Sequence, residues 1–391
     1  MSAPMENPSR ALAALMQAAL AIPGIASAEI STDYLYSRYQ EGDIASDRLQ
    51  PGASGQRFSI DTHLFRLSAP VADVVGGLDL TWETLSGASP WFVMPGTDGR
   101  PVQAMSGASI REDRKAVEGS VLIPNAPLPA KFSIGYSTED DYRAIHGGVE
   151  AELGNADNSL VWTGGIGYSA DTVEPTVGKF PIGTQRDHRD ALTAYGGASL
   201  IVGKRTTVQG SISFERGSGY LSDPYKRAWI VDQATTVADQ RPDERLSGAF
   251  NLKLRHRYQQ LNAALHLDYR YFRDDWKIDA HTVEVAWHQV IGDSWRIAPG
   301  LRWYSQSQSY FYAPYYASQR GDSLASSDYR LSPFGAISLR LDATKQIERL
   351  SLGLGAELYR ADAAYALKKV AVENPGLVRY WSLQARIGYS F

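Results

Sequence analysis

Two pairs of adjacent aspartates, Asp140-Asp141 and Asp274-Asp275, are the first residues in this sequence whose types and spacing could do chemistry. Paired carboxylates beside a histidine can activate water. Aspartate is also common in tight turns, where its side chain accepts a hydrogen bond from the backbone. Both pairs fall where the chain is expected to reverse direction, so turn formation is the favoured interpretation.

Histidine is the second residue type that could carry a site. Four histidines fall on the polar side of alternating segments, near carboxylates such as Asp61, Glu150, Asp268 and Glu284, and could bind a cation: they are His63, His146, His266 and His288. None has metal-ligand spacing, and the chain contains no cysteine.

No serine lies in a nucleophile elbow, and Gly164-Gly165-x-Gly167 lies inside an expected strand rather than in a phosphate loop. We therefore expect no catalytic residue, no metal, no cofactor and no enzymatic activity.

The elements that must position these residues are strands, as the last stretch of the chain shows. Residues 379–391 alternate strictly, and one side carries Trp381, Leu383, Ala385, Ile387, Tyr389 and Phe391. A strand that is apolar on one side, polar on the other and closed by an aromatic residue is typical of a bacterial outer-membrane β-barrel. The pattern therefore predicts the bacterial outer membrane as the location.

Similar alternation recurs along the chain at hairpin spacing. It predicts strands at 30–40, 56–68, 74–85, 110–123, 130–138, 143–154, 159–169, 190–203, 206–216, 244–257, 260–272, 278–290, 295–307, 329–342, 349–360 and 379–391. We expect an all-β, sixteen-stranded antiparallel transmembrane β-barrel; fourteen or eighteen strands are the alternatives if a loop contains a hairpin or one segment is merged. The connections after every second strand are short and most of the others are long, which predicts short periplasmic turns and long extracellular loops.

The first 28 residues differ from the rest of the chain. An apolar run from Ala11 to Ile25 follows Arg10 and ends in Ala26-Ser27-Ala28, a small-x-small cleavage pattern. We interpret residues 1–28 as a signal peptide and residues 29–391 as the barrel; a short membrane anchor is the alternative. The absence of cysteine suits a chain that crosses an oxidising periplasm, and a net charge of -4 does not favour a nucleic-acid partner.

Phasing each strand by its apolar side assigns the polar side to the lumen. This predicts an acidic wall formed by Asp61, Asp79, Glu83, Glu118, Glu150 and Glu152. The opposite wall is predicted to be basic and to contain Lys253, Arg255, Arg270, Arg302, Arg340 and Arg386. Opposed walls in an open pore would favour polar solutes, whereas a salt-bridged interior would close the barrel.

Several motifs resemble an uncharacterised family of bacterial outer-membrane proteins known only as a domain of unknown function. They are Ser86–Ser89 and Ser106–Ser109 (both SGAS), Tyr136–Tyr142 (YSTEDDY), Gly219–Lys226 (GYLSDPYK), Arg241–Arg245 (RPDER), Tyr269–Trp276 (YRYFRDDW), Ala280–Thr282 (AHT) and Trp303–Gln306 (WYSQ). The resemblance implies an outer-membrane barrel often encoded beside a flavin transferase, a thioredoxin-like protein and a small lipoprotein. It implies no catalytic residue. The motifs fall mostly at outer strand ends and in long loops, where loop packing and a binding surface are both consistent with them.

The leading functional hypothesis is a porin-like channel for small polar or charged solutes. The alternative is a non-conducting scaffold that docks a periplasmic or extracellular redox or flavin partner, which only the resemblance suggests. Expected partners are outer-membrane lipid, the barrel assembly machinery through the C-terminal strand, and a periplasmic redox protein or lipoprotein.

Overall fold

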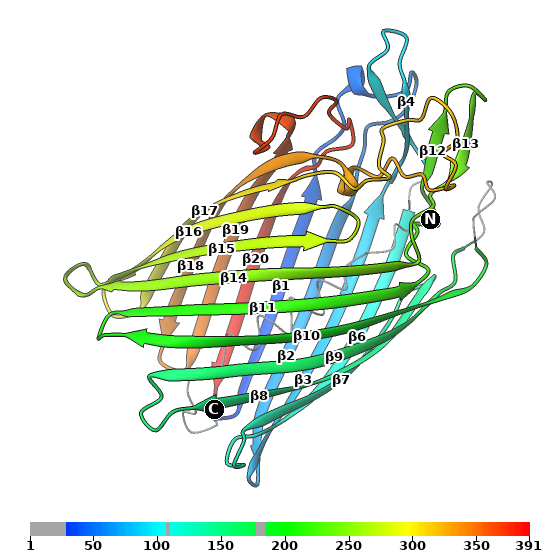
Figure 1. Ribbon diagram of the computed structural model, residues 1–391. Coiled ribbons are helices and arrows are strands. Elements are labelled where there is room, and N and C mark those ends of the chain that lie inside the picture. The colour runs from blue at the N-terminus through cyan, green and yellow to red at the C-terminus, as the bar shows by residue number, and fades with distance from the viewer. Residues whose placement is uncertain (1–28, 107–109, 177–183) are drawn as a thin grey trace.

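The computed structural model describes residues 29–106, 110–176 and 184–391. In that part of the chain sixteen antiparallel strands close into one barrel, in the order β1-β2-β3-β6-β7-β8-β9-β10-β11-β14-β15-β16-β17-β18-β19-β20 (Figure 1). Each strand pairs with its neighbour in this order, and β1 pairs with β20 from Ser31↔Ser390 to Glu41↔Tyr380. The predicted sixteen-stranded barrel is confirmed.

The barrel strands are long enough to cross a bilayer at a tilt. Their bounds are β1 Ser31–Glu41, β2 Ser59–Val71, β3 Val74–Gly87, β6 Ile110–Ile123, β7 Ala130–Thr138, β8 Tyr142–Gly154, β9 Leu160–Val173, β10 Asp187–Val202, β11 Thr206–Gly219, β14 Glu244–Tyr258, β15 Ala263–Asp274, β16 Asp279–Ile291, β17 Trp295–Gln306, β18 Phe334–Ile347, β19 Leu350–Asp362 and β20 Arg379–Ser390. No helix in the described ranges is long and apolar enough to cross a membrane.

The outer surface of the barrel is apolar because successive side chains in a strand point to opposite faces. On β19, Leu354 is 68% exposed and Leu358 is 60% exposed, whereas the alternate positions Gly353, Gly355 and Glu357 belong to the other face. In water such a surface would be unfavourable, but in lipid it is the expected exterior of a closed barrel. The strand pattern therefore places this barrel in the bacterial outer membrane.

Short turns join the strands at one end of the barrel. Residues 72–73, 124–129, 155–159, 203–205, 259–262, 292–294 and 348–349 make these connections. Left-handed backbone at Gly203 and Asn262 allows two of them to reverse the chain tightly. Short turns of this kind face the periplasm in outer-membrane barrels, and the first and last strands begin and end on the same side.

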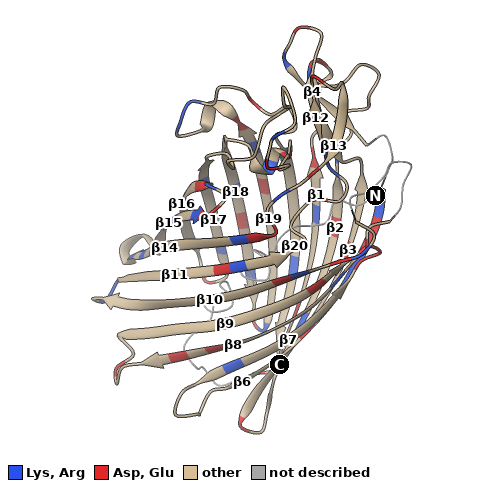
Figure 2. Ribbon diagram, turned by 45° about the vertical axis from the view of Figure 1, so that its right-hand side comes forward, with Lys and Arg blue, Asp and Glu red and all other residues tan. Residues whose placement is uncertain are grey.

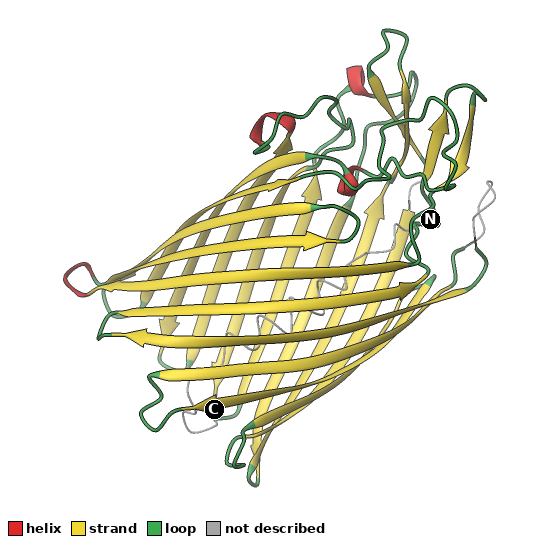
Figure 3. Cartoon of the chain, in the orientation of Figure 1, coloured by secondary structure: helices red, strands yellow, loops and turns green. Residues whose placement is uncertain are grey.

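Long loops gather at the opposite, extracellular end (Figure 3). They contain two hairpins, β4 (Pro90–Pro95) with β5 (Pro101–Met105) and β12 (Arg227–Ile230) with β13 (Thr235–Ala238). They also contain the short 3₁₀ helices η1 (Ser46–Arg48), η3 (Tyr329–Leu331) and η4 (Ala363–Tyr365), while η2 (Gln259–Leu261) lies in a periplasmic turn. We call residues 42–58, 88–106, 220–243, 307–333 and 363–378 the extracellular cap.

The buried apolar residues of this protein lie mainly in the cap. One cluster joins the cap residues Leu221, Phe311, Tyr312 and Leu331 to Trp276 and Ile278 of the β15–β16 connection, and a second joins Ala228, Ile230, Tyr316 and Ala325. Because these residues come from connections that are far apart in the sequence, the loops pack on one another as a folded unit.

Several strands begin or end a few residues from their predicted bounds, and one strand shows the largest shift. The strand predicted at 329–342 is β18 at Phe334–Ile347, because Tyr329–Leu331 forms η3 and the Asp328 side chain accepts a hydrogen bond from the Arg330 N–H. The predicted signal peptide, residues 1–28, lies outside the described residues.

Candidate functional site in the barrel lumen

Strand pairing defines an inner face, because directly opposed residues of adjacent strands point to the same side. We take this face to be the one opposite the exposed apolar residues. Of the residues predicted for the acidic wall, it carries Asp79, Glu83, Glu118, Glu150 and Glu152. Of those predicted for the basic wall, it carries Lys253, Arg255, Arg270, Arg302, Arg340 and Arg386.

The prediction that Asp61 lies on the acidic wall is wrong. Asp61 and His63 share their face with Phe65 and with the 54%-exposed Trp82 of β3, so they lie on the outer surface. Asp61 is compensated there by two neighbours on β1: the Tyr36 hydroxyl donates to it over 2.7 Å, and the Arg38 guanidinium pairs with it. Both contacts lie near the extracellular end of β1 and β2, where the outer surface can be polar.

Many charges of the inner face are neutralised by a neighbour on an adjacent strand. On the acidic side, Arg66 Nη2 lies 2.7 Å from Asp79 Oδ2 and Arg114 Nη1 lies 2.6 Å from Glu83 Oε2. On the basic side, Arg255 pairs with Asp268. Among the described residues, the inner-face charges without such an ion pair include Glu150, Glu152, Lys253, Arg270 and Arg302, and these retain the predicted difference between the walls. On β9, β10 and β11 the charged segments lie toward the cap (Figure 2).

A cavity of about 220 Å³ opens on the basic side of the lumen. It is lined by Arg255, His266, Asp268, Glu284, Ala286, His288, Ala298, Gly300, Arg340 and Asp342, which come from β14 to β18. The imidazole rings of His266 and His288 lie 3.8 Å apart between their centroids, and Arg340 Nη2 lies 3.5 Å from Glu284 Oε1. Cationic, anionic and imidazole groups thus face one space, which suits a small solute that carries charge or several hydrogen-bonding groups.

Tyrosines line the inner face between this cavity and the cap. The ring of Tyr380 lies 4.7 Å from that of Tyr39 and 4.7 Å from that of Tyr359, and the second pair is stacked. The Tyr380 hydroxyl donates to Glu357 Oε1 over 3.1 Å. Such rings offer flat surfaces and hydroxyl groups to a passing solute.

A network of buried charges holds the cap together. Arg241 donates from Nε to Asp239 over 2.7 Å and from Nη2 to Asp328 over 2.9 Å, and Arg330 Nη2 donates to Asp223 over 2.8 Å. Burial alone would raise the pKa of Asp328, but Arg330, Lys226 and Arg241 hold that pKa well below its ordinary value. Two of the motifs in the family resemblance therefore contribute to loop packing, because Asp223, Lys226 and Arg241 are all buried.

The two aspartate pairs lie at outer hairpin tips, as predicted, but they differ in what they contact. Asp274 accepts hydrogen bonds from the Ile278 N–H over 2.8 Å and from Arg245 over 2.7 Å, and Asp275 accepts one from the Leu246 N–H over 3.0 Å. This confirms turn formation for Asp274-Asp275. Asp141, in contrast, is buried and accepts a hydrogen bond from the Tyr225 hydroxyl of the cap.

Asp141 also belongs to a group of carboxylates that sequence reasoning missed. One oxygen each from Glu112, Glu139 and Asp141 lies within 4.8 Å of the others. Glu112 is on β6 and the other two residues are at the β7–β8 tip, so nothing in their sequence spacing indicates the contact. The inward phase of Glu112, combined with the pairing of β6 and β7, is the signal that could have found it.

Comparisons with known proteins give a family and weak structural likenesses. The bacterial polysaccharide outer membrane secretin is 8% identical, with 94% of this chain and 100% of that chain covered and a TM-score of 0.49. The outer membrane protein opdK from Pseudomonas aeruginosa is 10% identical, with coverages of 93% and 99% and a TM-score of 0.40. A ferric enterobactin receptor (PfeA) mutant from the same organism is 11% identical, with a TM-score of 0.45, and the alignment spans 86% of this chain but only 54% of the receptor.

No curated protein sequence matches the chain significantly. The family profile described as "Protein of unknown function (DUF3570)" matches residues 12–385, which is nearly the whole sequence and includes every barrel strand at least in part. This outer-membrane β-barrel therefore belongs to the DUF3570 family.

Proposed function

We propose that the barrel passes small polar or charged solutes across the outer membrane and that the cavity between β14 and β18 is where they are recognised. The observation that supports this most directly is the cavity itself, in which arginine, histidine and carboxylate groups face the same space. Sixteen strands enclose a lumen wide enough for water, and fixed charges on its wall would select solutes by charge.

Conductance of the purified protein in a planar bilayer tests the proposal. We expect a steady open-pore current that is reduced by a small zwitterion such as glycine or a dianion such as succinate more than by neutral glucose at the same concentration. Arg340→Gln should weaken that block, whereas Asp293→Asn in an exposed periplasmic turn should leave it unchanged. A barrel that inserts but conducts no current would contradict the channel and support the alternative, a scaffold for a redox or flavin partner.

Two further proposals concern biogenesis. We propose that residues 1–28 are removed as a signal peptide, so that the mature chain begins at Glu29; N-terminal sequencing of the protein purified from outer membranes tests this. We also propose that the barrel assembly machinery contacts β20, whose outer face is a continuous apolar stripe that includes Leu383 and Ile387.

A further inference from the structure

The carboxylates at the β6 and β7–β8 ends converge on the inner face just below the cap. Glu112, Glu139 and Asp141 each place an oxygen within 4.8 Å of the other two. Two oxygens on opposite sides of one calcium ion are about 4.8 Å apart, since calcium-oxygen distances are about 2.4 Å. The three carboxylates therefore lie close enough together for one oxygen of each to bind a single cation of this size.

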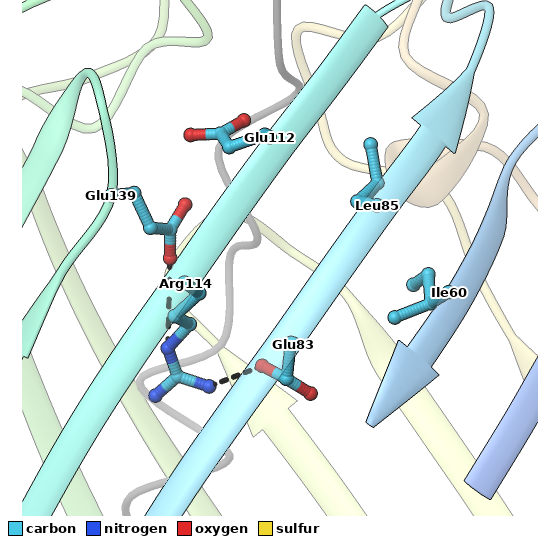
Figure 4. A pocket seen from close by; sticks show the side chains of 6 residues that line it. All are labelled: Ile60, Glu83, Leu85, Glu112, Arg114 and Glu139. Atoms are coloured by element: carbon cyan, nitrogen blue, oxygen red, sulfur yellow. Dashed lines mark hydrogen bonds and ion pairs between the residues drawn. The ribbon is translucent and has the colours of Figure 1, made fainter. Parts of the chain in front are cut away.

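Glu112 provides a second observation that points to a ligand. Its side chain is only 6% exposed, and its Oε1 atom is buried without a hydrogen-bond partner among the described residues. A buried carboxylate oxygen without a partner destabilises the folded protein unless a cation or a hydrogen-bond donor contacts it. In Figure 4 the carboxylates of Glu112 and Glu139 lie near one another on the same side of β6.

A small cavity adjoins these two carboxylates. It measures about 20 Å³, enough for one water-sized particle, and is lined by Ile60, Glu83, Leu85, Glu112, Arg114 and Glu139. Arg114 is the cation that faces it, but its Nη1 lies 2.6 Å from Glu83 and its Nε lies 3.6 Å from Glu139, so it does not neutralise Glu112.

We infer that Glu112, Glu139 and Asp141 bind one divalent cation, and that the cation is calcium. All three donors are carboxylate oxygens, which suit calcium or magnesium and not zinc. Calcium is favoured because magnesium usually binds through one or two carboxylates and keeps several waters, whereas calcium accepts more protein oxygens in a less regular geometry. Water completes the coordination in this assignment.

The position of the site determines what the cation would do. Bound calcium links β6 to the tip between β7 and β8, and Asp141 continues the connection to the cap through the Tyr225 hydroxyl. The site would therefore fasten the cap to the barrel wall in an extracellular medium that contains calcium. This role does not depend on whether the barrel conducts.

Calcium titration of the purified full-length protein, followed by calorimetry, tests the inference. We expect one site per chain with a dissociation constant of about 0.1–1 mM, the range of extracellular calcium modules. Terbium should bind the same site and show luminescence when tyrosine is excited, because Tyr225 contacts Asp141 directly. Calcium should displace terbium and abolish that signal.

Glu112→Gln and Asp141→Asn should each weaken calcium binding at least tenfold, whereas Asp293→Asn should bind as the wild type does. Without calcium, Glu112→Gln should resist protease at least as well as the wild type, because it removes repulsion between carboxylates; this separates loss of binding from misfolding. Absence of saturable binding, unchanged affinity in both variants, or tighter binding of magnesium than of calcium would each overturn the assignment.

Discussion

At the scale of single residues, the two faces of a strand should respond very differently to charge. Leu354 on β19 faces lipid and is 68% exposed, so Leu354→Arg should cost about 2–4 kcal/mol if the position is near mid-bilayer. Gln384 on β20 is exposed on the inner face, and Gln384→Arg should fold almost as well as the wild type. Urea titration of both variants in lipid vesicles measures the difference.

Equal stabilities of the Leu354→Arg and Gln384→Arg variants would contradict the assignment of faces on β19 and β20. The wild type and Leu354→Ala serve as controls, since the alanine variant removes the same side chain without adding a charge.

The raised pKa of Glu139 predicts a pH dependence for calcium binding. Because its folded pKa is about 7, above the ordinary value, protonation of Glu139 stabilises the folded tip below its ordinary pKa, and that stabilisation is lost as pH rises through about 7. Calcium must displace the proton, so calcium affinity should rise as the pH is raised from 6 to 8. Glu83, Glu112, Arg114 and Asp141 also face this group.

Calorimetric titrations at pH 6, 7 and 8 in buffers of different ionisation enthalpy would reveal the released proton. The Glu139→Gln variant should lose the pH dependence. An affinity that is constant over this range in the wild type would rule out Glu139 as a ligand.

Residue faces were predictable wherever one side of a strand is clearly apolar. On β2 that condition fails, because Ile60 and Leu64 point inward while Phe65 points outward. The rule that polar residues point inward therefore misplaced Asp61, whose charge is satisfied outside by Arg38 and Tyr36. The face that Asp61 occupies depends on contacts between side chains of β1 and β2. The alternation of residues within β2 alone does not predict those contacts.

At the scale of elements, the cap should depend on Asp328. This residue is buried, and it accepts hydrogen bonds from Arg241 and Arg330. Asp328→Asn would remove a negative charge that balances the buried Arg241 guanidinium and should destabilise the cap by about 3–5 kcal/mol. Limited trypsin digestion of the folded protein should then cut the cap much faster while the barrel strands stay protected.

A matched control is available in the same loop. Arg320 and Asp322 form an exposed pair 2.7 Å apart, so Asp322→Asn should change cap stability by no more than about 1 kcal/mol. Because the pKa of Asp328 is lowered, its stabilisation is present above its ordinary pKa and is lost only as pH falls below that value. Similar digestion rates for the two variants would show that the network does not hold the cap.

The sequence predicts the barrel elements well and the cap elements poorly, for a physical reason. Lipid on one side and polar lumen on the other impose a period of two, which can be recognised in each strand alone. In the cap, the hairpins β4–β5 and β12–β13 and the helix η3 depend on packing between distant loops, as in the contact of Tyr316 with Ile230 and Ala325. The shifted start of β18 has the same origin.

At the scale of the whole molecule, the two ends of the barrel should be distinguishable in intact cells. The chain has no cysteine, so Asp232→Cys in the β12–β13 hairpin and Lys204→Cys in the β10–β11 turn would each add one thiol. Asp232 is exposed, so a cysteine at that position is accessible to reagent. A membrane-impermeant maleimide should label only the cysteine at position 232, and both after permeabilisation.

Labelling at position 204 alone in intact cells would mean that the barrel is inserted with the opposite orientation. Labelling at both positions in intact cells, with periplasmic marker proteins unlabelled, would also contradict the assignment of the short turns to the periplasm.

The unpaired charges of the lumen should set ion selectivity if the barrel conducts. Glu150→Gln with Glu152→Gln should shift preference toward anions, and Arg270→Gln with Arg302→Gln should shift it toward cations. Both shifts should diminish as salt rises, since the Debye length falls from about 10 Å at 0.1 M to about 3 Å at 1 M. Reversal potentials across a salt gradient measure them.

Asp190 lies on the outer face, where it accepts a hydrogen bond from the Tyr168 hydroxyl. Asp190→Asn is therefore the control and should leave the reversal potential unchanged. Identical potentials for both double variants and the wild type would mean that these four side chains do not line the conduction path.

The pairing of β1 with β20 also bears on how the barrel would come apart. A sheet with free edges can lose its outermost strand first, whereas every strand of this barrel is hydrogen-bonded to a neighbour on both sides, and β1 alone pairs eleven residues with β20. Opening must begin with the rupture of one complete ladder of hydrogen bonds between two strands. No new contact forms at that stage to offset the loss, so the activation barrier to unfolding is high. The lifetime of the folded barrel would then be governed by the rate of that first rupture rather than by the equilibrium between folded and unfolded chains.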